Sequence, residues 1–339
     1  MIVRLGIAAA IASAGLMPAK AQTSTPQPYV SKSPIYLVIG YAPGGSYDLY
    51  ARLVARFLGK HMPGQPAIVP QNMPGAGSLQ AANYIYAVAP KDGTAIAALG
   101  ETIAMEQALQ NPGVRYDATK LTWIGRIASS NNIHLVWHSA KAQSMEDVKS
   151  IEMSVAGTGP ANLAETVPKL LNNVLGTKFK IVSGYPSSGP AMLAMERGEV
   201  DGTATSWAVV KAQHQAWLKD KKVRIILQDV PERDPELPDV PALVELAKND
   251  ADRQLLTLYA SGGAIGRAYT APPDLPTAAA AALRDSFQKM TQDPDLLADA
   301  AKMQVSIEPA DHKLLQQVVE QTVKVDDNIR KRVREIFGN

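Results

Sequence analysis

The sequence of 339 residues contains no cysteine. This absence excludes disulfide bonds, thiolate metal ligands and a thiol nucleophile, and it removes the cysteine that would carry a lipid anchor. A chain of this kind must be stabilised by its hydrophobic core alone. Its length is sufficient for two ordinary domains, each with a core of its own.

A net charge of either sign is almost absent as well. Lys and Arg number 34 and Asp and Glu 32, and two of the basic residues, Arg4 and Lys20, lie within the first 21 positions, which leaves 34 − 2 = 32 against 32. Nucleic-acid binding requires a basic excess that displaces counterions from phosphates. No basic amphipathic stripe predicts membrane binding either. We therefore expect neither partner, and we expect a monomer.

Hydrophobic runs long enough to span a bilayer are missing. Arg4, the uncharged run Leu5–Met17 and the small-x-small sequence Ala19-Lys20-Ala21 are typical of a signal peptide over residues 1–21, cleaved near Ala21. The run of about 13 residues is well short of the roughly 20 that cross a membrane. We expect an exported protein released into the bacterial periplasm.

Metal-binding and catalytic patterns are also missing. His134 and His138 are four residues apart, but "NIHLVWH" alternates like a strand, which would separate them by about 13 Å at about 3.3 Å per residue. The nearest match to a hydrolase Gly-x-Ser-x-Gly motif, at Gly184, has one residue too many. We expect no metal, no cofactor and no enzymatic activity, with an exported enzyme acting on a small organic acid as the alternative.

Short β-like runs alternate with helical segments, which is typical of βαβ units and of an α/β fold with mainly parallel sheets. In the first part of the chain the pattern predicts strands at Ile35–Tyr41, Ala67–Val69 and Ala95–Leu99 and helices at Leu49–Lys60, Leu79–Ala87 and Ile103–Gln110. In the helix Leu49–Lys60, large apolar residues recur on one face, so this face should pack on a sheet.

The pattern begins again after Leu121–His138. It predicts strands at Glu152–Val155, Phe179–Val182, Val200–Ala204 and Arg224–Leu227, and helices at Leu163–Leu175, Ala191–Arg197 and Val209–Leu218. The proline-rich stretch Asp229–Pro241 must be a loop. Beyond Tyr259–Tyr269, residues Pro276–Phe337 are predicted to be helical, with a break at Asp293-Pro294 and an extended piece at Gln304–Ile307.

Three strand-to-helix junctions carry glycines: Pro43-Gly44-Gly45-Ser46, Gly157-Thr158-Gly159, and the segment "GYPSSGPAML" from Gly184. At such a junction unpaired backbone N–H groups point beyond the strand end, and the helix N-terminus carries partial positive charge, which suits an anion. The nucleotide-binding fingerprints are incomplete or missing. The loops therefore favour a carboxylate held on each half of the chain, as in a dicarboxylate or a related organic acid.

Several motifs, in order along the chain, resemble the tripartite tricarboxylate transporter receptors, also called Bug proteins. They are Val38–Arg52 with Pro43-Gly44-Gly45 and Asp48, "NMPGAGSLQAANYI" from Asn72, "PKDGTAI" from Pro90, "GTGPANLAE" from Gly157, "GYPSSGPAMLAMERGEVDG" from Gly184 and "LPDVPAL" from Leu237. The resemblance implies a type II-like periplasmic binding protein of two αβ domains joined by two crossover segments. The domains would be residues 30–130 plus 262–339, and residues 131–261, with the ligand cleft between them.

The resemblance also implies a function and a site. The protein would capture a small carboxylate by hinge closure and deliver it to the membrane permease of the transporter, although a sensory receptor would use the same pocket. The ligand-binding residues implied for the first half are Pro43, Gly44, Gly45, Ser46, Asp48, Gly75, Ala76, Gly77, Gly100, Glu101 and Thr102, and those for the second half are Gly157, Thr158, Gly159, Asn162, Tyr185, Ser188 and Trp207.

Some positions depart from the family pattern or can be interpreted in two ways. Small hydroxyl residues are missing at Pro160, Ala161 and Glu101. If Glu101 points into the cleft it would repel a second ligand carboxylate unless it is protonated or paired; it could equally face solvent or cap the next helix. Asp48 could complement the helix dipole or hold an ammonium group or a water. Trp207 could form a wall of the pocket or lie in the core.

The hinge is expected where the chain passes between the halves, near Ile127–Ile133 and Tyr259–Ile265, because both stretches contain small residues or glycine. An open form would bind the ligand on one half, and contacts with the other half would stabilise the closed form.

Overall fold

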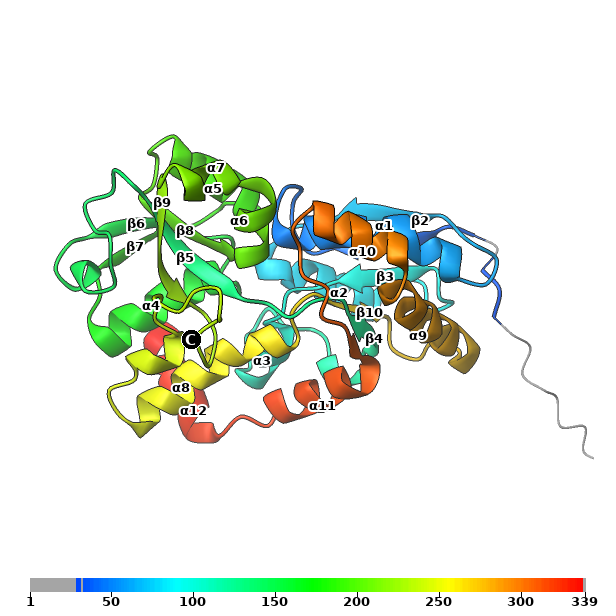
Figure 1. Ribbon diagram of the computed structural model, residues 1–339. Helices are drawn as coiled ribbons and strands as arrows, with labels where there is room; N and C mark the ends of the chain where they lie inside the picture. Colours follow the sequence, from blue (N-terminus) through cyan, green and yellow to red (C-terminus); the bar gives the residue numbers. More distant parts are fainter. Residues whose placement is uncertain (1–28, 32, 338–339) are drawn as a thin grey trace, which may run out of the picture.

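The computed structural model describes residues 29–31 and 33–337. The chain forms two β-sheets, each packed between helices, which lie side by side in the molecule (Figure 1). The predicted signal peptide lies outside the described residues. Within the described part, a search for membrane-spanning helices finds none of sufficient length and apolarity.

In the first sheet three strands are parallel to one another, and three further strands join them through antiparallel pairs. In spatial order its strands are β11 (Ala310–Asp311), β4 (Thr122–Arg126), β10 (Ala268–Ala271), β3 (Ala95–Ala98), β1 (Ile35–Ile39) and β2 (Ile68–Asn72). The pairs β1–β2 and β1–β3 are parallel, whereas β10 is antiparallel to β3 and β4, and β11 is antiparallel to β4.

Helices cover both faces of this sheet: α1 (Ser46–His61), α2 (Leu79–Ala87), α3 (Ile103–Ala108), α9 (Thr277–Thr291), α10 (Pro294–Lys302) and α11 (His312–Thr322). Successive side chains of β1 point to opposite faces of the sheet, so this strand contributes to the helix layers on both faces. Ile35, Leu37 and Ile39 belong to the core shared with α1, α9 and α10, whereas Val38 points to the opposite core with α2, α3 and α11. The apolar face predicted for α1 packs into the first of these cores.

The second sheet has the spatial order β7 (Phe179–Val182), β6 (Met153–Ala156), β8 (Gly202–Ser206), β5 (Asn132–Trp137) and β9 (Val223–Gln228). Its helices are α4 (Leu163–Leu175), α5 (Ser188–Glu196), α6 (Trp207–Gln213), α7 (Gln215–Lys219), α8 (Asp250–Ala260) and α12 (Asp327–Phe337). One core lies against α4, α8 and α12, and the other lies against α5, α6 and α7.

The α/β class, the two-sheet architecture and the mainly parallel direction of the strands are confirmed, although each sheet also contains antiparallel pairs. In the second sheet β6–β7 and β6–β8 are parallel, whereas β5 runs antiparallel to both β8 and β9. The strands that run against the others are β5 in the second sheet and β10 and β11 in the first, and β5 and β10 are each the first strand after a crossover. Both sheets are therefore mixed.

The chain passes between the sheets at residues 127–131, between β4 and β5, and again at residues 261–267, between α8 and β10. These two crossover segments lie side by side and are hydrogen-bonded to each other. Ile127 N donates to the Arg267 carbonyl at 3.1 Å, and Arg267 N donates to the Ala128 carbonyl at 2.9 Å. The segments lie where the sequence predicts the hinge; the hinge motion itself stays a prediction.

The last helix returns to the second half. Val333 of α12 is buried in the core formed by α4 and α8, and Phe337 stacks on Tyr259 of α8 with ring centroids 6.3 Å apart. Figure 1 shows α12 beside α8 and away from α9 and α10. The sequence predicts that all residues from 262 to 339 belong to the first domain, whereas α12 packs on the core of the second half. The amphipathic pattern of α12 does not reveal which core it covers.

Most predicted elements have the predicted type, with shifted ends. The strand predicted at Val200–Ala204 lies at Gly202–Ser206, and the helix predicted at Val209–Leu218 is interrupted at His214 into α6 and α7. Residues Asp229–Pro241 form a loop, as predicted, and the helix break falls at Asp293-Pro294. The extended segment near residue 304 leads to the short strand β11.

Candidate functional site

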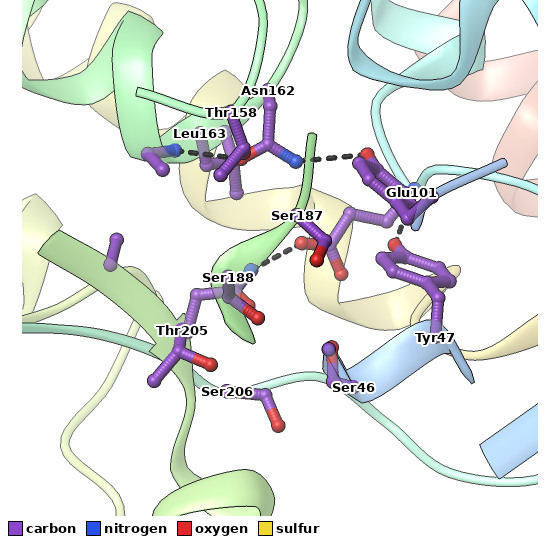
Figure 2. A pocket seen from close by; sticks show the side chains of 15 residues that line it. Ser46, Tyr47, Glu101, Thr158, Asn162, Leu163, Ser187, Ser188, Thr205 and Ser206 are labelled. Carbon is purple, nitrogen blue, oxygen red and sulfur yellow. Dashed lines mark hydrogen bonds between the residues drawn. The ribbon is translucent and has the colours of Figure 1, made fainter. Parts of the chain in front are cut away.

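A cavity of about 40 Å³ lies between the two halves (Figure 2). The first half contributes Tyr41, Gly45, Ser46, Tyr47 and Glu101, and the second half with the start of β5 contributes Asn132, Thr158, Asn162, Leu163, Ala164, Ser187, Ser188, Ala204, Thr205 and Ser206. Polar side chains from both halves point toward this space. A molecule bound here would contact both halves at once.

The positions of these residues follow from the sheets. Glycine-containing loops follow β1, β3 and β6, and the parallel strands of each half end at the cavity. In open α/β sheets, ligands bind beyond the carboxyl ends of the strands, at the point where the strand order reverses. The strand order reverses in this way at β1, which lies between β3 and β2, and at β6, which lies between β7 and β8.

Three helices begin at the cavity wall: α1, α4 and α5. Backbone N–H groups in the first turn of a helix lack intrahelical partners, and each helix N-terminus carries partial positive charge. In α4 one of these groups, Ala164 N, already donates to the N-cap side chain at Asn162 Oδ1, at 2.9 Å. The hydroxyl groups of Ser46, Thr158 and Ser188 add further donors. Among the described residues that line the cavity there is no lysine, arginine or histidine. An anion here would be held by backbone amides and hydroxyls.

Glu101 lines the cavity, and both its oxygens already have donors. Asn132 Nδ2 donates to Oε1, and the buried guanidinium of Arg267 donates to Oε2 at 3.2 Å. The Arg267 guanidinium also lies over the ring of Tyr47, with 4.3 Å from Cζ to the ring centroid. Of the alternatives left open by the sequence, the structure has the carboxylate facing inward and paired. The charge of Arg267 compensates that of Glu101.

Tyr41 and Tyr47 form a stacked pair at the wall, with ring centroids 4.6 Å apart. The Tyr41 hydroxyl accepts a hydrogen bond from Asn162 Nδ2 at 2.8 Å and donates to the Gly77 carbonyl at 3.2 Å. The Tyr47 hydroxyl accepts from Glu101 N at 2.8 Å. Burial raises the pKa of both phenols above the ordinary value, so both stay protonated at neutral pH. Tyr41 thereby links the two halves at the edge of the cavity.

Thr205 presents a polar atom to the cavity without a partner in the described part of the chain. The residue is only 4% exposed, and its Oγ1 is buried and makes no hydrogen bond within the described part of the chain. A buried hydroxyl without a partner costs free energy, and such groups commonly bind a ligand or an ordered water. Thr205 therefore marks the floor of the cavity as a place for a polar ligand atom.

Several of the site residues implied by the resemblance line the cavity: Gly45, Ser46, Glu101, Thr158, Asn162 and Ser188. Others are placed at contacts between the halves. A Cβ on Gly159 would lie 2.5 Å from the backbone nitrogen of Gly77, and the Thr102 hydroxyl donates to the Ala161 carbonyl at 2.7 Å. The glycines of these loops let two backbones touch across the cleft.

The remaining implied residues support the loops around the cavity. The carbonyl of Pro43 accepts from Ser187 Oγ at 3.3 Å, and Gly100 N donates to Ser78 Oγ at 2.9 Å. Gly44 contacts Gly189, a Cβ on which would lie 2.9 Å from the Gly44 carbonyl oxygen. The other supporting residues are Gly75 and Ala76 before α2, Gly157 after β6, and Tyr185 packed beside the core of α5 and α6.

Asp48 does not line the cavity but fixes the loop before α1. It accepts hydrogen bonds from Gly44 N at 3.2 Å, from Arg52 Nε at 2.9 Å and from Asn72 Nδ2 at 3.0 Å. Burial by itself raises the pKa of this carboxyl, but the hydrogen bonds from Arg52, Asn72 and Gly44 outweigh burial and lower it. Asp48 is thus an ionised anchor of the loop.

Sequence reasoning missed Tyr41, Tyr47, Asn132, Leu163, Ala164, Ser187, Ala204, Thr205 and Ser206, which also line the cavity. Four of them are direct neighbours of residues that were named, such as Ser187 beside Ser188. The hydroxyl run "TATS" at the end of β8 is a usable signal, because strand ends point into the cleft. Asn132 gives no such signal, since its place depends on the crossover. Among the described residues no group of three potential metal ligands occurs.

The fold and the cavity define the class of protein: a two-lobed α/β protein with a cavity between its halves. A family model described as "Tripartite tricarboxylate transporter family receptor" matches residues 50–334. The chain belongs to this family. This membership fits a protein that binds a solute without converting it.

Relatives and solved structures agree with this assignment. The chain is 29% identical over 260 residues to the UPF0065 protein in the gbd 5′ region of Cupriavidus necator, covering 72% of this chain and 73% of the relative. It is 29% identical over 303 residues to a UPF0065 protein of Agrobacterium vitis, covering 84% and 78%. The periplasmic binding protein BugD has the same fold, with a TM-score of 0.72 at 19% identity over 90% of this chain and 98% of BugD.

MatC of Rhodopseudomonas palustris, solved with bound malate, has a TM-score of 0.69 at 21% identity, covering 90% of this chain and 99% of MatC. A second protein of that organism, solved with adipate, has a TM-score of 0.68 at 21% identity, covering 91% and 98%. At this identity these likenesses concern the fold. The family description names the class of this chain as a receptor.

Proposed function

We propose that the protein is a periplasmic receptor that captures a small organic acid between its halves, with the carboxylate group in the cavity, and delivers it to the membrane subunits of a tripartite tricarboxylate-type transporter. One observation carries the proposal: the N-termini of α1, α4 and α5 meet at one cavity lined by hydroxyl groups. The family description and the malate and adipate in related folds support the same class of ligand.

The physical basis is charge-assisted hydrogen bonding in the cavity between the halves. Backbone amides at a helix N-terminus are fixed in direction and suit a carboxylate. Each hydrogen bond to a charged group contributes on the order of 1.5–3 kcal/mol, so a few of them reach the roughly 8 kcal/mol of micromolar binding. The cavity residues named by the resemblance, Gly45, Ser46, Thr158, Asn162 and Ser188, would make these contacts, with Thr205 in addition.

Capture requires two domains that move. We assign the domains to the two sheets, with residues 127–131 and 261–267 as the hinge. Contacts between the halves, such as Asn162 Nδ2 to the Tyr41 hydroxyl at 2.8 Å, belong to the closed form. In an open form the cavity would be split between the halves and accessible to the ligand. A ligand that contacts both halves stabilises the closed form by its differential affinity, and the permease would recognise that form.

The proposal is tested by titration calorimetry of ligand-free mature protein with monocarboxylates, dicarboxylates, tricarboxylates and phosphate. Ser188 is the first residue of α5 and lines the cavity. In Ser188→Asp the new carboxylate suits the helix N-terminus, so the fold is retained, but it repels an anionic ligand. We expect carboxylate affinity to fall by about tenfold or more, which is about 1.4 kcal/mol.

Thr277→Asp is the matched control, because Thr277 is the first residue of α9, is exposed and lies outside the cavity. It should leave affinity unchanged. If no acid binds to ligand-free protein, the proposed ligand class is wrong. If acids bind and Ser188→Asp has no effect, the proposed position of the carboxylate is wrong. Uptake of the bound acid by vesicles that contain the cognate permease would test delivery.

A further inference from the structure

A second space adjoins the cavity. It is a groove of about 900 Å³ bounded by Tyr50 and Glu308 on the first half, and by Trp207, Lys211 and the proline-rich loop 230–236 on the second. The crossover residues Ser130 and Asn131 lie at its floor. Trp207, which the resemblance implies to be a ligand-binding residue, therefore lies in the groove and not in the cavity.

Three separate elements contribute to both spaces. Ser206, the N-cap of α6, lines both the cavity and the groove. Asn132 lines the cavity and its neighbour Asn131 lines the groove. On α1, Ser46 lines the cavity and Tyr50, one turn later, lines the groove. The two spaces are therefore adjacent, and Ser206 borders both.

The cavity is too small for a whole organic acid. Its volume is about 40 Å³, against about 900 Å³ for the groove. The cavity volume is sufficient for a carboxylate head and little more. Ligand pockets in proteins usually measure about 300–1,000 Å³, which the groove provides. The body of the ligand therefore has to occupy the groove.

The groove offers an aromatic surface and buried polar atoms. The Trp207 indole is held in place because its Nε1 donates to Glu236 at 2.5 Å, and prolines 231 and 235 lie on the same loop. Ser130, 5% exposed, has a buried Oγ without a hydrogen-bond partner in the described chain. Asn131 Nδ2 donates to Asp234 at 2.9 Å, which leaves its Oδ1, likewise buried, without a donor in that part of the chain.

The charges of the groove disfavour a second carboxylate. Its basic side chains already bridge acidic ones: Lys211 Nζ lies 2.5 Å from Glu236, and Arg233 Nη2 lies 2.7 Å from Glu245. The charged residues that line it are Lys211, Arg233, Glu232, Asp234, Glu236 and Glu308, two basic against four acidic. Like charges across a binding surface reduce affinity.

We propose that the preferred ligand is an elongated monocarboxylic acid. Its carboxylate lies in the cavity, its flat apolar body lies against Trp207, and its far end carries a hydroxyl or amino donor that reaches Asn131 Oδ1. This inference rests on the proposed function for the position of the carboxylate. It adds the class of ligand, which differs from the malate and adipate of the related folds.

The test compares three acids of matched shape by titration calorimetry: phenylacetate, 4-hydroxyphenylacetate and 1,4-phenylenediacetate. We expect 4-hydroxyphenylacetate to bind about tenfold tighter than 1,4-phenylenediacetate, because its hydroxyl satisfies a buried acceptor and a second carboxylate meets like charge. In Asn131→Ala the preference for the hydroxylated acid over phenylacetate should disappear.

Trp207→Ala should reduce the affinity for the ring acids by about tenfold relative to propionate, which has no body to place in the groove. Leu297→Ala, an exposed apolar residue on α10, is the control and should change nothing. Thermal unfolding of each variant verifies the fold. Tighter binding of 1,4-phenylenediacetate or adipate than of 4-hydroxyphenylacetate would overturn the inference and leave the proposed function intact, whereas failure of every acid, propionate included, would overturn both.

Discussion

At the scale of single residues, the role of a side chain depends on partners that are remote in the sequence. Glu101 follows β3, but its donors come from remote segments: Asn132 is the first residue of β5, directly after one crossover, and Arg267 is the last residue of the other crossover. The pair Glu101–Arg267 has side chains that are 6% and 2% exposed. A buried ion pair contributes little net stability, but removal of one partner leaves an uncompensated charge.

We predict that Arg267→Met lowers the free energy of unfolding by about 3–5 kcal/mol, because Glu101 is left buried without its counter-charge. The double variant Arg267→Met with Glu101→Gln should be more stable than the single variant. Urea unfolding of the single and double variants measures both effects. A single-variant cost below about 1 kcal/mol, the range of exposed pairs, would contradict this account.

Asp48 shows the same dependence at the loop before α1. Hydrogen bonds from Arg52, Asn72 and Gly44 lower its pKa against the opposing effect of burial. We predict that Asp48→Asn costs about 1.5–3 kcal/mol at pH 7, the range for hydrogen bonds to a charged group. Because the folded pKa is lowered, ionised Asp48 stabilises the folded state at pH values above the unfolded pKa of about 3.9. This stabilisation is lost as the pH falls through the folded pKa. The difference between wild type and variant in urea unfolding should therefore shrink in acid; a difference independent of pH would contradict the prediction.

At the scale of elements, α3 connects the two halves. It packs against α11 of the first half, and its Met105 belongs to the core of α4, α8 and α12 in the second. Glu106 of α3 is buried beside this contact and accepts a hydrogen bond from Asn111 Nδ2 at 2.6 Å. Burial raises the pKa of this carboxyl to about 7, although the hydrogen bond from Asn111 acts in the opposite direction.

We predict a dependence of stability on pH from this one residue. Because the folded pKa is raised, the folded state binds more protons than the unfolded state between about pH 4.5 and 7, so stability falls as the pH rises through that window. The loss is on the order of 3 kcal/mol, at 1.36 kcal/mol per pKa unit. Glu106→Gln should remove it and raise the free energy of unfolding at pH 8.

Urea unfolding at pH 5 and pH 8 measures this effect. Glu152→Gln is the matched control, because the Glu152 side chain is 68% exposed, and it should retain the wild-type dependence. If Glu106→Gln shows the same difference between the two pH values as the wild type, the ionisation of Glu106 is not its source.

At the scale of the whole molecule, glycines serve the contact between the halves. Gly159 has φ +127°, and a Cβ there would lie 2.5 Å from Gly77 N; a Cβ on Gly77 would lie 2.8 Å from Asn162 N. Gly44 and Gly189 meet in the same way on the other side of the cavity. The contact between the halves therefore needs backbones without side chains at these points, independently of any ligand contact.

We predict that Gly159→Ala prevents full closure. Its apparent affinity for a carboxylate should fall by about tenfold or more, because the binding-competent closed form is less populated. Small-angle X-ray scattering should show a radius of gyration that no longer decreases when the acid is added. Gly176→Ala is the matched control, since Gly176 also has positive φ, at +74°, but has open space around it. Normal compaction of Gly159→Ala with the acid would contradict the prediction.

The sequence was sufficient for properties that depend on neighbours along the chain. The alternation of apolar runs predicted the strands β1 and β7 and the helix α4, because burial periodicity and capping residues such as Asn162 are local. The glycine-bearing loops at strand ends predicted which segments lie at the cavity. The family resemblance, carried by motifs in order, was likewise a property of the chain.

Only the tertiary structure decided which loop residues face the cavity and which face the other half. From the sequence alone Glu101 could point inward or outward. In the structure it points inward and is paired with Arg267, which is 166 positions away. Gly159 and Thr102 resemble ligand-binding residues in sequence, but they contact Gly77 and Ala161 across the cleft. The physical reason is that hydrogen bonds and close packing depend on distances in space, and the approach of two sheets is set by their whole cores, which no local pattern encodes.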